Sequence, residues 1–556
     1  MRDERPAIVA VDPDEDAIRR IAGELGRYER DYRIVCERSV ESALGELEAM
    51  RHSGDRVAVV LAARGDERLR GEALLERTSD LHPHAKRGLL IEFGAWGDHE
   101  TAVVIREAMT RGHIDYYVLK PWSEPDELFH RTICEFLHEW RRATDQGRRE
   151  LTVVAERLSP RGFELRNLLA RNGVPHAFHG SDSEEGRRLL AVCGRDESSE
   201  PIVLLPDDRI LVDPSNQDLA EKGYRVPTRL EQDSGPFDVV VVGTGPSGLA
   251  AAVYASSEGL RALVVERESI GGQAGASARI RNYLGFQRGI AGGELATRAY
   301  QQAWVFGTNF LLMREVAGLQ THDGGHAVAV SDGSEIEARS VVLATGVAYR
   351  RLGIPALEDF GGRGVFYGYS SSDAQQFAGA KVFVVGAGNS GGQAAADLSR
   401  YAADVTLVCR RPSLADNMSR YLQDEIEAAG VHVKLSTTIV GAVGEGRLQE
   451  LTLRGPSGAR EVVRADAVFV LIGGRPRSDW LPQEVERDER GFILTGGGEH
   501  LFETSLPGVF AIGDVRAGSV KRVASAVGEG AVVIQQVHRY LDESAVSSRP
   551  IREPAS

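Results

Sequence analysis

Two segments of the chain each combine an apolar strand, a glycine-rich turn and a helix of small residues. The first is FDVVVVGTGPSGLAAAVYA, which starts at Phe237, and the second is AKVFVVGAGNSGGQAAADL, which starts at Ala380. In such a segment the first glycine allows a tight turn, the second lets the backbone approach a pyrophosphate, and the third lets helix and strand pack closely. The helix N-terminus then offers free N–H groups to the phosphates. One such motif is weak evidence, but two of them predict two dinucleotide sites in an α/β fold.

The residues after each motif indicate which nucleotide it binds. Glu266 ends the strand LRALVVE after the first motif, where a carboxylate can hold the hydroxyls of an adenosine ribose. The strand after the second motif ends in Arg410 and Arg411, where an NAD site usually has an acid. Two guanidinium groups suit a 2'-phosphate, so we expect NADPH to be preferred over NADH.

Further motifs connect the region from Phe237 to about Leu541 with a known family. They are ARSVVLATGVAYR, AVFVLIGGRPRSDWL, the GGQ at Gly271 to Gln273, and a C-terminal segment in which GVFAIGDV precedes KRVASAVGEG. The region resembles the low-molecular-weight thioredoxin reductases. The resemblance implies an FAD-binding domain formed by residues 236–350 and 476–541, an NADPH-binding domain formed by residues 351–475, and a tail formed by residues 542–556.

The same resemblance assigns residues to each cofactor. For FAD they are Gly243, Gly245, Pro246, Ser247, Gly248, Glu266, Arg267, Gly271, Gly272, Gln273, Asn282, Thr345, Gly346, Gly513, Asp514, Lys521, Arg522, Val523 and Ala524. For NADPH they are Gly386, Gly388, Asn389, Ser390, Gly391, Arg410, Arg411, Ile472 and Gly473. The family carries a third arginine where this chain has Ala415, so the preference for NADPH is expected to be weaker, and Arg420 lies close enough in sequence to substitute. Asp514 would bind the ribityl or phosphate portion of FAD, and the segment 521–524 would lie beside the pyrimidine end of the isoalloxazine, at a helix N-terminus that stabilises negative charge.

The cysteine pair of that family is missing from this chain. Alignment on Gly364 and Asp373 places Tyr369 and Ser372, or their neighbours, at the two cysteine positions. The four cysteines, Cys36, Cys134, Cys193 and Cys409, are widely spaced and form no sequence motif. We expect buried single thiols rather than a pair brought together by folding, and no certain catalytic residue besides the flavin.

Residues 1–146 alternate five apolar strands with amphipathic helices, as in a doubly wound sheet. With Asp12 after the first strand and Lys120-Pro121 after the fifth, the segment resembles a response-regulator receiver. A working receiver needs an aspartate after the third strand, where this chain has Ala62 and Ala63, and a second acid, where it has Pro13. Ile91 or Glu92 stands near the position of the required hydroxyl. We therefore expect a receiver fold that has lost phosphotransfer and kept a docking or dimerising surface.

Residues 150–230 resemble a thioredoxin or glutaredoxin-like domain. The redox loop of such a domain would be Ser159-Pro160-Arg161-Gly162, which contains no cysteine, and Pro201 would precede the strand beside it. Together, the three regions resemble a family of bacterial proteins named fused response regulator/thioredoxin-disulfide reductase. The linker at residues 231–236 is polar.

Composition restricts the function further. Acids outnumber Lys and Arg by 81 to 66, a net charge of -15, which argues against nucleic acid as a partner. Four cysteines in 556 residues favour a reducing compartment over a disulfide framework. The N-terminus has no apolar stretch of signal-peptide type, and no run has membrane-spanning length. We expect a cytoplasmic homodimer of several domains, with no membrane association and no metal site.

The favoured function is an FAD-containing NADPH oxidoreductase whose acceptor is not an internal disulfide. The acceptor stays open between a protein such as ferredoxin, a quinone and oxygen. The C-terminal tail lacks the aromatic residue that related ferredoxin reductases place over the flavin. The alternative is a redox-responsive signalling or scaffold protein in which flavin reduction changes partner docking with little turnover.

Overall fold

The computed structural model describes residues 5–547, apart from 65–70, 93, 96–97, 123–124, 145–150, 157–158, 173, 196–199, 208, 225, 231–234, 278, 288, 323, 370–373, 375 and 499. The chain forms two compact units, one made of Met1–Arg148 with Glu427–Ala429 and the other made of the remainder. In the part of the chain that is described, no helix is both long and apolar enough to span a membrane.

The first unit contains a parallel five-stranded sheet in the order β2-β1-β3-β4-β5. Helices α1 and α5 pack on one face, and α2, α3 and α4 pack on the other. Both faces are covered, which explains why β3 is an uninterrupted apolar run. The elements are β1 Ala7–Val11, α1 Glu15–Leu25, β2 Arg33–Glu37, α2 Val40–Ser53, β3 Val57–Ala63, α3 Gly71–Leu81, β4 Lys86–Ile91, α4 His99–Thr110, β5 Tyr116–Leu119 and α5 Glu127–Thr144.

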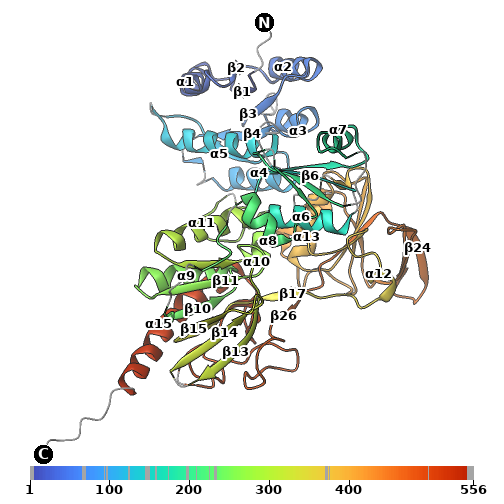
Figure 1. Ribbon diagram of the computed structural model, residues 1–556. Coiled ribbons are helices and arrows are strands. Elements are labelled where there is room, and N and C mark those ends of the chain that lie inside the picture. Colours follow the sequence, from blue (N-terminus) through green and yellow to red (C-terminus); the bar gives the residue numbers. More distant parts are fainter. Residues whose placement is uncertain are drawn as a thin grey trace, which may run out of the picture. The chain divides into compact units, whose positions relative to one another are not determined.

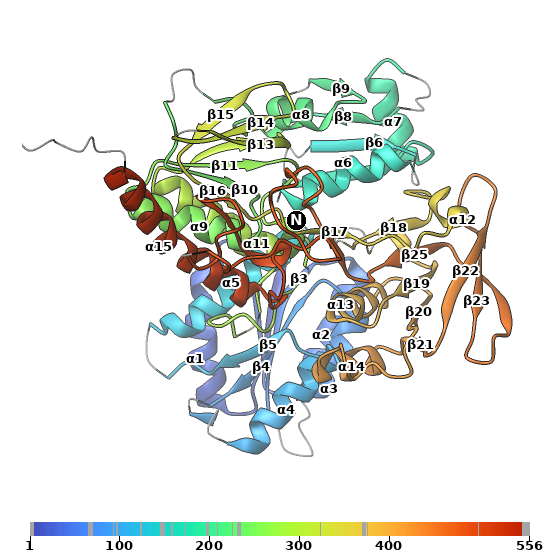
Figure 2. The same cartoon turned by 90° about the horizontal axis from the view of Figure 1, so that it is seen from below.

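The second unit begins with a four-stranded mixed sheet in the order β7-β6-β8-β9, where β6 and β7 are parallel and the other pairs antiparallel. Helix α6 starts with Pro160 at its first turn, where a missing N–H costs nothing, and Ser159 caps it. Figure 2 shows α6 and α7 beside β6. The elements are β6 Leu151–Ala155, α6 Pro160–Arg171, β7 His176–Gly180, α7 Glu184–Val192, β8 Ile202–Leu204, β9 Ile210–Val212 and α8 Asn216–Leu219.

A parallel sheet in the order β12-β11-β10-β16-β27 follows. One face packs on α9, α11 and α15, and the other on the antiparallel sheet of β13, β14 and β15 (Figure 2). The elements are β10 Val239–Val242, α9 Pro246–Ser257, β11 Ala262–Glu266, α10 Gly272–Gly275, α11 Gly292–Val305, β12 Asn309–Leu312, β13 Val316–His322, β14 Gly325–Val330, β15 Glu335–Ala338, β16 Val341–Leu343, β27 Val509–Ala511, a 3-10 turn at Gly513–Val515, and α15 Val523–Ser547. Helix α15 therefore continues past residue 541, into the segment expected to be a tail.

The next sheet repeats this plan in the order β18-β25-β19-β20-β21. Helices α13 and α14 cover one face, and an antiparallel sheet of β22, β23 and β24 covers the other. The elements are α12 Pro355–Glu358, β18 Val365–Tyr367, β19 Lys381–Val385, α13 Asn389–Leu398, β20 Asp404–Val408, α14 Arg420–Ala428, β21 His432–Lys434, β22 Thr438–Val443, β23 Glu450–Arg454, β24 Arg460–Arg464 and β25 Ala467–Val470.

A two-stranded antiparallel ribbon, β17 (Val347–Tyr349) and β26 (Gly474–Pro476), carries the chain between these two sheet domains. Figure 1 shows the two strands side by side. Strand β17 follows β16 of the first sheet domain after a few residues, and β26 follows β25 of the second sheet domain after a few residues. The ribbon therefore begins next to the domain that contains the first glycine-rich turn.

Candidate functional site

The first glycine-rich turn has the geometry of a phosphate cradle between β10 and α9. Gly243 has φ +108, and a Cβ there would lie 2.5 Å from the Ala344 oxygen. A Cβ on Gly248 would lie 2.0 Å from the Gly243 oxygen, so a side chain would push helix from strand. Gly245 is different, because a Cβ there would meet no atom within 4 Å. The space in front of the α9 N-terminus is open, which fits a pyrophosphate.

Glu266 ends β11 and is held by protein donors. Its Oε2 accepts from the N–H of Thr244 at 2.9 Å and from the hydroxyl of the same residue at 2.7 Å, while its Oε1 accepts from the N–H of Glu268 at 2.9 Å. These bonds fix the carboxylate, which is 8% exposed, at the wall of a small pocket that Gly243, Arg267 and Thr345 also line. A fixed carboxylate in this place can accept from ribose hydroxyls with its remaining lone pairs.

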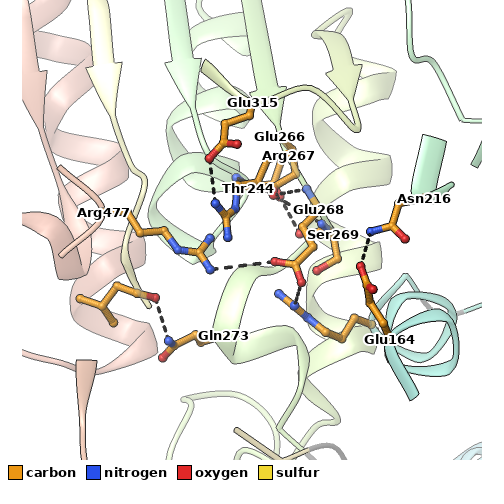
Figure 3. A network of polar contacts seen from close by, with 12 residues as sticks. Glu164, Asn216, Thr244, Glu266, Arg267, Glu268, Ser269, Gln273, Glu315 and Arg477 are labelled. Atoms are coloured by element: carbon orange, nitrogen blue, oxygen red, sulfur yellow. Dashed lines mark hydrogen bonds and ion pairs between the residues drawn. The ribbon is translucent and has the colours of Figure 1, made fainter. Parts of the chain in front are cut away.

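Three charged residues of this region, Glu268, Arg477 and Arg171, were not predicted from the sequence, and Figure 3 labels the first two. Arg477 lines the pocket and lies 3.9 Å from Glu268, and burial lowers the pKa of its guanidinium. Arg171, on α6, donates to the Oε1 of Glu268 at 2.6 Å. The GGRPRS segment that contains Arg477 was visible in the sequence, but no local pattern marks Arg171. Arg267 is paired with Glu315 at 2.8 Å and also faces the pocket.

The GGQ turn lies against the first cradle. Gly272 has φ +55, and a Cβ there would come within 3.2 Å of the Gly245 Cα. Gln273 donates from Nε2 to the Val347 oxygen at 2.8 Å, and Thr345 donates its hydroxyl to the Arg477 oxygen at 2.9 Å. Gly346, at φ +62, follows Thr345 at the start of the ribbon. The structure therefore brings the predicted residues 243–248, 271–273 and 345–346 together, while Asn282 lies exposed on a separate loop.

The C-terminal residues predicted for FAD lie between β27 and the first turn of α15. Gly513 packs so closely on the first turn of α9 that a Cβ there would lie 2.4 Å from the Ser247 hydroxyl. Asp514 is partly buried, and burial raises the pKa of its carboxyl. Lys521 donates to the main-chain oxygen of Asp514 at 2.6 Å and lies over the ring of Phe492. Arg522 precedes α15, and Val523 and Ala524 form its first turn, so the predicted helix N-terminus is present.

The second glycine-rich turn, between β19 and α13, repeats the geometry of the first. Gly386 has φ +136, and a Cβ on Gly391 would lie 2.3 Å from the Gly386 oxygen. Gly388 caps α13, and a Cβ there would meet no atom within 4 Å. Asn389 and Ser390 begin the helix, and the Asn389 Oδ1 accepts from the Ser419 N–H at 2.8 Å. Ile472 and Gly473 follow β25 at the same sheet edge, since the Leu471 oxygen faces Gly386.

Arg410 and Arg411 follow β20 with exposed side chains. Among the described residues neither guanidinium has an acidic partner, whereas Arg420 pairs with Asp424 at 3.0 Å. The main chain of the pair is anchored, because the Arg411 oxygen accepts from the Ser436 N–H at 2.9 Å. Two unpaired cations at the end of the second strand of this fold can receive a phosphate.

Tyr369, which the sequence predicts at or next to one of the two cysteine positions, is packed and hydrogen-bonded. Tyr369 donates to the Asp397 Oδ2 at 2.5 Å, and its ring packs edge-on against Phe469. Burial raises the pKa of the Asp397 carboxyl. Ser372 lies outside the described residues. All four cysteines are free, and burial raises the pKa of the Cys36 thiol to about 11.

The cysteine-free loop of the four-stranded sheet domain packs against the second dinucleotide fold. A Cβ on Gly362 would lie 2.9 Å from Pro160, and the ring of Phe163 lies 4.6 Å from that of Phe366 on β18. Ser159 accepts from the Gly162 N–H at 3.1 Å and serves as a helix cap. The loop is thus a structural contact, with its hydroxyl already engaged.

In the first unit, the Lys120 Nζ lies 2.8 Å from the Asp12 Oδ2 and 2.8 Å from the Glu92 Oε1. Ala62 and Ala63 end β3 with buried methyl groups. The ion pair joins the ends of β5 and β1 across the sheet edge, and no carboxylate from β3 joins it.

The fold and the two cradles define an α/β protein with paired dinucleotide-binding domains. Comparison with known proteins gives its family. Residues 237–530 match the model of the pyridine nucleotide-disulphide oxidoreductases, and the chain belongs to that family. It is 34% identical over 307 residues to the thioredoxin reductase of Treponema pallidum, covering 55% of this chain and 97% of that protein. The corresponding identity to the Bacillus subtilis thioredoxin reductase is 33% over 315 residues, covering 55% and 95%.

Solved structures agree with this assignment. The crystal structure of the T. acidophilum thioredoxin reductase matches with a TM-score of 0.52 and 30% identity, over 56% of this chain and 99% of that one. The C-terminal region of about 300 residues is therefore homologous to thioredoxin reductase, and homology implies FAD and NADPH as its cofactors.

Proposed function

We propose that residues 237–541 form an FAD-dependent NADPH oxidoreductase that passes electrons to an acceptor other than an internal disulfide. The observation that carries the proposal is that residues 237–541 contain both cradles but a single cysteine, Cys409, so no internal disulfide can form within them. When bound, FAD supplies the redox chemistry by accepting a hydride from NADPH and passing its electrons on.

The residues of this chain would contribute position and charge. Gly245 leaves room for the FAD pyrophosphate, and Glu266 is fixed where it would accept from the ribose hydroxyls. The N-terminus of α15 would stabilise negative charge on the flavin. Arg410 and Arg411 would hold the 2'-phosphate of NADPH. The acceptor is separate from the chain's own thiols, because all four are unpaired.

The test uses two valine substitutions. Gly245 and Gly388 both have an extended backbone that valine adopts without strain, with φ -61 and φ -91, and each faces open space. Gly245→Val is expected to give folded protein without flavin. Gly388→Val is expected to stay yellow but to resist anaerobic bleaching by NADPH. Each variant controls for the folding of the other.

Normal bleaching of Gly388→Val by NADPH would show that the second cradle is not the NADPH site. If Gly245→Val retains its flavin, the first cradle is not the FAD site.

We further propose that the whole chain is a fused response regulator/thioredoxin-disulfide reductase in ancestry, with receiver-like and thioredoxin-like domains that have lost their reactive groups. The parallel order of the five-stranded sheet, the Asp12–Lys120 pair and the mixed order of the four-stranded sheet support this. No carboxylate at Ala62 or Ala63 is available for phosphorylation, so these domains are proposed to dock partners or a second copy of the chain.

A second candidate, a redox-responsive signalling protein, is favoured by one contact. Arg171 of the thioredoxin-like domain pairs with Glu268, whose N–H binds Glu266 at the proposed FAD ribose site. Flavin state and domain position could be linked through this pair. Steady-state turnover with a panel of acceptors separates the two functions, because a sensor reduces its flavin once and then stops.

A further inference from the structure

Four arginines gather around one pocket on the ribbon that connects the two dinucleotide folds. The pocket has a volume of about 540 Å³ and is lined by Ala348, Tyr349, Arg350, Arg351, Arg475 and Arg490. Ala348 on β17 lies opposite Arg475 on β26, and Arg490 comes from the segment after the ribbon. None of the described residues that line the pocket is acidic. We refer to this surface as the arginine pocket.

The charges of the arginine pocket are open to a partner. Arg350 and Arg490 are exposed, and in the described part of the chain neither forms an ion pair. Arg351 pairs with Glu358 and Arg475 with Asp479, both at 2.6 Å, but these arginine side chains are 70% and 66% exposed. Exposed ion pairs contribute little and are easily exchanged for an incoming carboxylate. Arg351 also lies over the ring of Tyr367, which holds it in place.

The pocket adjoins the proposed flavin site. Strand β17 of the ribbon begins with Val347, whose main-chain oxygen accepts from Gln273 of the GGQ turn. Thr345 and Gly346 directly precede that strand. A partner seated on the ribbon would therefore be next to residues proposed to hold FAD. The surface contrasts with the chain as a whole, which carries 81 Asp and Glu residues against 66 Lys and Arg residues. Such a contrast steers an acidic partner to one place.

We propose that the arginine pocket is the docking surface for a small acidic electron-carrier protein, which is the acceptor of the oxidoreductase. The inference rests on the proposed function. In each turnover NADPH is oxidised to NADP⁺ with release of one proton, and two one-electron carriers are each reduced by one electron, so atoms and electrons balance.

The test reverses the two unpaired charges. Arg350→Glu/Arg490→Glu is compared with wild type and with a control, Arg454→Glu/Arg460→Glu, whose exposed arginines face each other on β23 and β24. Both variants change the net charge equally. The probe is an acidic [2Fe–2S] ferredoxin, and two quantities are measured: its binding to the protein at low salt, and its NADPH-dependent reduction.

We expect wild type and control to bind and reduce the probe, with rates that fall as the Debye length shrinks from about 30 Å at 0.01 M to about 8 Å at 0.15 M ionic strength. The pocket variant should lose roughly tenfold or more in kcat/KM for the probe. Its NADPH-dependent reduction of a neutral quinone dye should be unchanged, because neither arginine belongs to the proposed nucleotide sites.

The docking proposal is overturned if wild type does not bind the probe, or if the control variant loses as much kcat/KM for the probe as the pocket variant. Inhibition by inorganic pyrophosphate is measured in parallel. A pocket variant that escapes this inhibition but keeps its activity with the probe also overturns the proposal, because it indicates a site for small anions. Dye reduction tests the proposed function separately. If wild type does not reduce the dye with NADPH, the oxidoreductase proposal is wrong. Probe binding tests the docking surface whether or not the dye is reduced.

Discussion

Replacing Arg410 and Arg411 by alanine should change nucleotide preference without removing flavin. The two side chains extend into solvent after β20 and have no acidic partner among the described residues. Their turn is held by the main chain, through the Ser436 N–H and the Arg411 oxygen, so alanine should leave the backbone in place. The change removes charge that only NADPH, with its 2'-phosphate, can use.

The expected size follows from the contacts that would be lost. A hydrogen bond to a charged group contributes about 1.5 to 3 kcal/mol, and exposed side chains belong at the lower end because water replaces part of the lost interaction. Two contacts at about 1.5 kcal/mol give about 3 kcal/mol in total. At about 1.4 kcal/mol per factor of ten, kcat/KM for NADPH should fall by roughly 100-fold, and by roughly tenfold in each single variant.

The assay is dye reduction at fixed ionic strength with NADPH and with NADH. NADH values should change by less than about twofold, because NADH makes no contact with the lost charges. Arg454→Ala/Arg460→Ala is the matched control: both arginines are exposed, lie on β23 and β24 and are outside the residues proposed to hold NADPH, so both nucleotides should be little affected. Equal loss for NADPH and NADH in the double variant would refute the assignment of this arginine pair to the 2'-phosphate.

Two other outcomes are expected. A variant with all four cysteines changed to serine, or to alanine where buried, should bind FAD and keep NADPH-dependent dye reduction. Wild type should not sustain insulin reduction through thioredoxin. If wild type does sustain it and the cysteine-free variant does not, the chain contains a functional thiol pair. Burial raises the pKa of Asp514, so the protonated carboxyl is favoured in the fold, and this contribution to stability is lost as pH rises through the raised pKa. Asp514→Asn should therefore raise the melting temperature of the apoprotein at pH 8 more than at pH 4 while weakening FAD binding; an apoprotein destabilised at pH 8 would contradict the burial argument.

Local sequence determined the two nucleotide cradles. Each consists of one strand, one turn and one helix, and the glycines stand where a Cβ would clash or where the backbone needs positive φ, as at Gly243 and Gly386. The positive φ of Gly243 and Gly386 and the close approach of Gly248 and Gly391 to them arise within a few residues, so they can be read from the sequence. The missing chemistry is equally local: Ala62 offers no carboxylate and Tyr369 no thiol, whatever surrounds them.

Contacts between distant segments were decided by the tertiary structure. The Arg171–Glu268 pair, the packing of Phe163 on Phe366 and the bond from Tyr369 to Asp397 join residues whose sequence neighbours give no sign of the partner. The arginine pocket arises in the same way, because the antiparallel register of β17 and β26 places residues near 350 beside residues near 475. Sequence fixes which groups the chain possesses, while such pairings depend on how sheets and helices pack, and packing sums many weak contacts that no short segment contains.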